Sequence, residues 1–153
     1  MKTLLSVLVF VIALSCSTTG KIAAQQEKKG QAIEFEYSAL TRGSYKKVKI
    51  TPAGVETIDG VNSKAVINPI STEDWNWLVT YYEDNVAMKG IRLEDLKVPS
   101  KKHQYDGALA AVFTIKVAEQ VDSTQTFDHG TPAPEISALV SKVIALSGLD
   151  KAK

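Results

Sequence analysis

The chain has 153 residues, with 18 lysine and arginine residues against 17 aspartate and glutamate residues. This balance excludes the broad basic surface that is typical of nucleic-acid-binding proteins, so we expect no nucleic-acid partner. A single cysteine excludes an intrachain disulfide and a thiolate metal site. Once a leader is set aside, the remaining length suits one domain with its own hydrophobic core.

Residues 1–15 have the pattern of an export signal. Lys2 supplies the positive charge, and an apolar stretch runs from Leu4 to Leu14, which is too short to cross a bilayer as a helix. Cys16 follows this stretch directly, as the lipidated cysteine does in bacterial lipoproteins, although Ala13 stands where that signal usually has leucine. We therefore expect a signal peptide over residues 1–15 and a lipid anchor on Cys16.

A second cleavage site competes with the first. The small-residue string ending at Ala24 resembles a signal peptidase site, and its use would release a soluble periplasmic or secreted protein. Residues 16–31 are polar and lack apolar periodicity, which is typical of a flexible tether. In a lipoprotein this tether would hold a single domain, residues 32–149, away from the membrane on the periplasmic side or at the cell surface.

A β-hairpin opens this domain. Apolar and acidic residues alternate over residues 33–37, and apolar and basic residues alternate over residues 45–51. A turn centred between Thr41 and Arg42 predicts four facing pairs, namely Phe35 with Val48, Ile33 with Ile50, Glu36 with Lys47 and Glu34 with Lys49. The lysines are then cross-strand partners of the glutamates, and the alternative is a phosphate or lipid-headgroup site.

Two short strands, residues 55–58 and 64–67, lead to a helix over residues 71–86 with Ser71 as its cap. An apolar stripe at helical spacing predicts its buried face, formed by Trp75, Leu78, Val79, Tyr82 and Val86. Trp77 and Tyr81 form a second stripe, which either extends the core or faces a partner. A single helical turn is expected at residues 92–96.

The longest apolar run after the leader, residues 107–118, predicts a long central strand. Its alternation predicts one buried face, formed by Leu109, Ala111, Phe113, Ile115 and Val117. A turn near residues 120–123 and a return strand follow, and a last helix runs from Pro134 to a C-terminal cap at Gly148. We predict an α+β domain, with a mostly antiparallel sheet of about 5–6 strands and two helices packed on one face.

The sequence contains fragments of catalytic sites and no complete one. On paper His103, Asp106, Asp128 and His129 form a metal-binding set. The predicted hairpin places Asp128 opposite residues 114–117. At about 3.3 Å per strand residue, it then lies on the order of 30 Å from His103 unless the loop before the strand folds back. We therefore expect no metal, no cofactor and no catalytic residues.

The string Phe127-Asp-His-Gly-Thr-Pro132 is the most distinctive local motif. We interpret it as a structural turn, in which Gly130 adopts a positive φ and His129 is partly exposed. Ligand binding is the alternative. The possible binding surface combines this turn with an exposed turn arginine and the second helical stripe: Arg42, Trp77, Tyr81, Asp128 and His129.

Four strings together resemble a group of small uncharacterised bacterial envelope proteins: Phe35-Glu-Tyr37, Thr41-Arg-Gly-Ser-Tyr45, Tyr105-Asp-Gly-Ala108 and Phe127-Asp-His-Gly130. That resemblance implies no activity. More distantly, the order of elements is similar to that of emfourin-like inhibitors of thermolysin-type proteases, which also have an opening hairpin, an acidic helix, a strand pair and a proline-started last helix.

We therefore expect a non-catalytic envelope module, anchored in the membrane through its lipid, that binds a protein or another envelope ligand. The alternative is a protein inhibitor of a secreted metalloprotease. An envelope enzyme is the third hypothesis, which a pocket joining His129 to another titratable side chain would favour.

Overall fold

The computed structural model describes residues 33–105 and 107–149, so the leader, Cys16, the tether and Asp106 lie outside it. An antiparallel sheet in the order β4-β3-β2-β1-β5-β6 dominates this part of the chain, and β7 pairs with β5. The strands are β1 (Ile33–Leu40), β2 (Tyr45–Thr51), β3 (Gly54–Asp59), β4 (Val66–Asn68), β5 (Ala110–Val117), β6 (Gln120–Ser123) and β7 (Phe127–Asp128). The helices are α2 (Thr72–Tyr82) and α3 (Ser137–Ser147), so the α+β prediction is confirmed.

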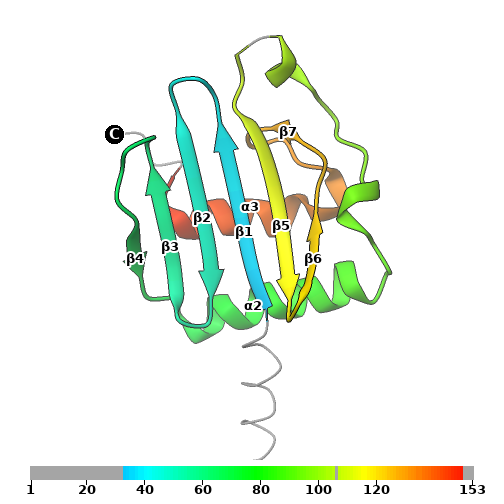
Figure 1. The fold of residues 1–153 in the computed structure, drawn as a ribbon. Coiled ribbons are helices and arrows are strands. Elements are labelled where there is room, and N and C mark those ends of the chain that lie inside the picture. Colours follow the sequence, from blue (N-terminus) through cyan, green and yellow to red (C-terminus); the bar gives the residue numbers. More distant parts are fainter. Residues whose placement is uncertain (1–32, 106, 150–153) are drawn as a thin grey trace, which may run out of the picture.

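The core forms between the sheet and the helices. In β1 every second residue from Ile33 to Ala39 is buried, and in β5 the predicted face is buried at Ala111, Phe113 and Ile115. The ring of Phe35 lies 6.1 Å from that of Trp75 and 6.2 Å from that of Tyr82, which are both on α2. α3 contacts β1, β2 and β3 and lies behind them in Figure 1.

The predicted caps at Ser71 and Gly148 are confirmed, but α3 begins at Ser137, because Pro134–Ile136 form a separate 3-10 turn before it. The Ser71 hydroxyl accepts a hydrogen bond from the Asp74 amide at 3.0 Å, which caps α2. A π-helical turn, Glu83–Ala87, continues α2, and Gly148 ends α3 with a left-handed φ of 69°. Within residues 33–105 and 107–149, no helix is long and apolar enough to cross a membrane.

The predicted register of the first hairpin is wrong by two residues. Phe35 pairs with Ile50 and Tyr37 with Val48, because the turn is centred between Arg42 and Gly43. The predicted two-residue turn would require positive φ at Thr41 and Arg42, which is unfavourable for a β-branched residue. A shift by two residues keeps every side chain on its predicted face. The predicted ion pairs therefore still form diagonally across the strands, as Lys47–Glu36 at 3.1 Å and Lys49–Glu34 at 3.5 Å.

The turn of the central hairpin is also misplaced in the prediction. Val117 pairs with Gln120, so the chain reverses at Ala118 and Glu119, with Ala118 at a φ of 52°. Residues 120–123 are consequently the strand β6 instead of a turn. This earlier reversal places Asp128 opposite Ala110 and not opposite residues 114–117.

Candidate functional site

The largest consequence of the corrected hairpin is a contact between His103 and Asp128. The connection before β5 folds back, and the Nδ1 atom of His103 lies 2.7 Å from Oδ1 of Asp128. Both side chains are only 8% exposed. The predicted separation of about 30 Å, which assumed an extended strand, is therefore wrong.

The carboxylate of Asp128 accepts several hydrogen bonds from the loop that precedes β5. Its oxygens accept hydrogen bonds from the backbone amides of Lys102 at 2.9 Å and of His103 at 2.7 Å. Burial raises the pKa of Asp128, but hydrogen bonds from Ser100, His103 and Lys102 outweigh it and hold the pKa far below its usual value. Asp128 is thus an anion held by several hydrogen-bond donors, and its side chain is turned away from solvent.

His129 contacts the core on the other side of the same turn. Its Nδ1 atom lies 2.6 Å from the hydroxyl of Tyr37, and the ring of Tyr37 is completely buried. His129 is partly exposed, as predicted, and Gly130 has the predicted positive φ, at 77°. His103 is therefore hydrogen-bonded to Asp128, and His129 is hydrogen-bonded to Tyr37. Among residues 33–105 and 107–149, no group of three or more histidine, cysteine, aspartate or glutamate side chains could hold a metal ion.

The five residues of the predicted binding surface do not lie together. Arg42 and β7 lie at the same end of the sheet, because Leu40 pairs with Ala110 and Ala110 pairs with Asp128. α2 crosses the opposite end, where β1 begins and where Phe35 contacts Trp75 (Figure 1). The Trp77 and Tyr81 rings on α2 stack with their centroids 5.0 Å apart. Lys142 of α3 lies 5.7 Å from the centre of the Trp77 ring, so this pair covers the junction of the helices.

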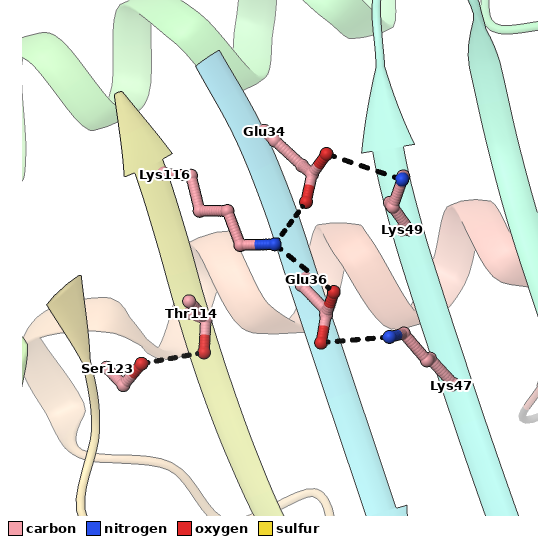
Figure 2. A network of polar contacts seen from close by, with 7 residues as sticks. All are labelled: Glu34, Glu36, Lys47, Lys49, Thr114, Lys116 and Ser123. Atoms are coloured by element: carbon pink, nitrogen blue, oxygen red, sulfur yellow. Dashed lines mark hydrogen bonds and ion pairs between the residues drawn. The ribbon is translucent and has the colours of Figure 1, made fainter. Parts of the chain in front are cut away.

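Figure 2 shows a polar network on the face of the sheet that is opposite the core. Lys116 of β5 bridges Glu34 at 2.8 Å and Glu36 at 3.7 Å, and the lysines of β2 flank the same two glutamates. Burial raises the pKa of Glu34, but its bonds and ion pairs with Lys116 and Lys49 lower it overall. Each lysine of this network has an acidic partner, which supports the interpretation of these residues as cross-strand pairs.

A groove of about 700 Å³ opens at the other edge of the core, between α2 and the β5–β6 hairpin. Its apolar side is formed by Tyr82, Val86, Ile91, Ile115 and Val117. Its polar rim is formed by Arg92, Glu94, Gln120, Asp122 and Ser123. Neither histidine lines this groove, so it does not join His129 to another titratable side chain.

The wall of the groove is held in place by two long-range hydrogen bonds. Oδ2 of Asp122 accepts from the Leu93 amide at 2.9 Å, and the Gln125 side chain donates to the Glu94 carbonyl at 3.1 Å. Leu93 lies in a 3-10 turn (Leu93–Asp95), and its fully buried side chain packs in the core and fixes this side of the groove. Figure 1 shows this green connection running beside β6 at the edge of the sheet.

Tyr82 contacts both the core and the groove. Its ring packs edge-on against Phe35 and also lines the groove. Burial and the negative charges of Asp122 and Glu83 raise the pKa of the Tyr82 phenol, which therefore remains a neutral hydrogen-bond donor at physiological pH. Sequence reasoning placed Tyr82 in the core and did not find the groove, because its walls come from segments about 30 residues apart.

Comparisons with protein families, with curated proteins and with solved structures each found no match to this chain. The resemblances drawn from the sequence strings and from the order of elements therefore stay predictions. The function has to be argued from the geometry of the described residues.

Proposed function

We propose that this protein is a non-catalytic binding module of the bacterial cell envelope, exported and anchored through a lipid on Cys16, and that it binds its ligand in the groove beside β6. The observation that carries the proposal is the groove itself. It combines an apolar wall with a polar rim and has the size of typical ligand sites, which enclose about 300–1,000 Å³.

The roles of the titratable residues elsewhere support binding over catalysis. Asp128 and His103 tie the loop before β5 to β7, and His129 is hydrogen-bonded to the buried Tyr37. These contacts indicate that the Asp-His-Gly string stabilises the fold. On the outer sheet face, Glu34 and Glu36 are similarly paired with lysines of β2 and β5.

A matched pair of tryptophan substitutions tests the proposal. Ala87 lines the groove, whereas the neighbouring Met88 is 80% exposed and does not line it. Ala87→Trp should fill the groove, and Met88→Trp should leave it open. Tagged full-length wild type and Met88→Trp should retain a shared component from envelope extracts, and Ala87→Trp should lose it. Equal retention by all three proteins would contradict a ligand site in the groove.

Inhibition of a secreted metalloprotease is the alternative function. The observed order of elements, with an opening hairpin, a helix, a second hairpin and a proline-preceded last helix, is the order on which that resemblance rests. The purified protein should leave thermolysin-type proteases active if our proposal is right. Stoichiometric inhibition that persists in Ala87→Trp would instead favour an inhibitor that acts through another surface.

A further inference from the structure

The charges around the groove indicate which ligands it can accept. Asp122 and Glu94 are acidic, and the guanidinium of Arg92 is already paired with Glu94. Asp122 forms no ion pair among residues 33–105 and 107–149, and its known hydrogen bond, from the Leu93 amide, uses Oδ2 alone. Oδ1 of Asp122 is therefore available for a cation at the rim.

The aromatic wall of the groove adds to this preference. Part of the Tyr82 ring lines the groove while the same ring is braced against Phe35. A cation placed beside Asp122 would also be attracted to the face of an aromatic ring within about 6 Å of it. The part of the chain that the structure describes provides no hydrogen-bond partner for the Tyr82 hydroxyl, so this group can bind a ligand.

The remaining surface of the groove favours an apolar body on the ligand. Among its lining residues Val86 and Ile115 are buried, whereas Ile91 and Val117 are half-buried and offer apolar surface to a ligand. Aliphatic carbon on these side chains gains from contact with apolar ligand surface at roughly 25 cal/mol per Å² buried. An apolar wall next to an unneutralised carboxylate is complementary to an amphipathic cation and repels an amphipathic anion.

We propose that the groove binds a small amphipathic cation, with its amine or ammonium group at Asp122 and its apolar chain or ring against Tyr82, Ile91 and Val117. This proposal rests on the groove being the ligand site of the module, and it adds the chemical class of the ligand. Carboxylates and phosphates with the same apolar body should be disfavoured.

Three probes of equal chain length separate the contributions of charge and apolar surface. The purified full-length protein, labelled with ¹⁵N, is titrated with n-octylammonium, n-octanol and octanoate while amide shifts are followed by NMR. Octylammonium should move the amides of residues 82–94 and 115–123. It should bind about tenfold more tightly than octanoate, the ratio expected for one partly solvated charge pair. Octanol should bind at the same place with intermediate affinity.

Two substitutions complete the test. Asp122→Asn removes the charge but keeps an oxygen that can accept from the Leu93 amide, so it should abolish the preference for octylammonium and preserve octanol binding. Glu56→Gln, on β3 in the other half of the sheet, should change nothing. Equal affinities of the wild type for the three probes would overturn the cationic ligand class and leave the groove as a binding site. If no probe moved groove amides, the proposed function itself would be contradicted.

Discussion

Phe113 gives the most direct test of how the sheet packs. Its side chain is completely buried in the middle of β5, opposite Tyr37 of β1. Phe113→Ala removes an entire ring from this core. It leaves in place the hydrogen bonds of the residue 113 backbone, whose carbonyl accepts from the Thr124 amide and whose amide donates to the Thr124 hydroxyl. Phenylalanine-to-alanine changes at such sites cost about 3–5 kcal/mol, which is a large part of the roughly 5–15 kcal/mol that stabilises a typical domain.

Lys116 provides the matched control on the opposite face of the same strand. Its side chain is 39% exposed and forms ion pairs with Glu34 and Glu36, and exposed pairs of this kind contribute about 0–1 kcal/mol. Urea unfolding followed by circular dichroism measures both variants. With an m-value of about 2 kcal/mol per molar urea, Phe113→Ala should lower the midpoint by about 2 M and Lys116→Ala by about 0.5 M or less. Equal midpoints for the two variants would refute the assignment of faces.

Three further predictions concern the β7 turn and the leader. The pKa of Asp128 is lowered in the folded protein, so the stabilisation from its carboxylate is complete above the unfolded pKa of about 3.9 and is lost as the pH falls further. Asp128→Asn should therefore melt well below wild type at pH 7, with a gap that narrows below about pH 4; a gap that is constant with pH would contradict this. Gly130→Val should lower the free energy of unfolding by about 1–2 kcal/mol, because the φ of Gly130 is 77°. Gly43 has equally open space around it and no positive φ, so Gly43→Val should change the free energy of unfolding by no more than about 0.5 kcal/mol. Equal effects of the two substitutions would show that φ is not the cause. Mass spectrometry of the mature protein should find a lipid-modified Cys16 as its first residue, and a free N-terminus at Gln25 would end the lipoprotein hypothesis.

Local periodicity explains why much of the fold was predictable. The alternation in β1 and β5 and the helical stripe around Leu78 each identify a buried face, and any register that misplaced them would expose the core. Ser71 and Gly148 likewise mark helix ends through chemistry confined to one turn of chain. These signals require no knowledge of which distant segments meet.

The positions of the turns and of the site depend on contacts between distant segments, which local periodicity does not predict. The reversal at Ala118 lacks the glycine or asparagine that usually marks a positive φ, so the sequence pattern favours a turn in the polar residues that follow it. The predicted separation of Asp128 from His103 also assumed an extended chain before β5, whereas this loop folds back and brings the two side chains into a hydrogen bond. The hydrogen bond between the Leu93 amide and the Asp122 side chain, which helps to shape the groove, joins the 3-10 turn to β6. No local sequence pattern predicts a contact between these two segments.

The central claim is that this protein binds its ligand at the edge of the sheet beside β6. A photo-activated benzoylphenylalanine at Val121, which is 62% exposed on the groove, can test this claim in living cells that produce the protein. The same probe at Ile67, which is 69% exposed on β4 at the other edge of the sheet, serves as the control. Our account predicts a discrete adduct, detectable by mass spectrometry, from Val121 and none from Ile67. Adducts from Ile67 alone, or the same adducts from both positions, would contradict it.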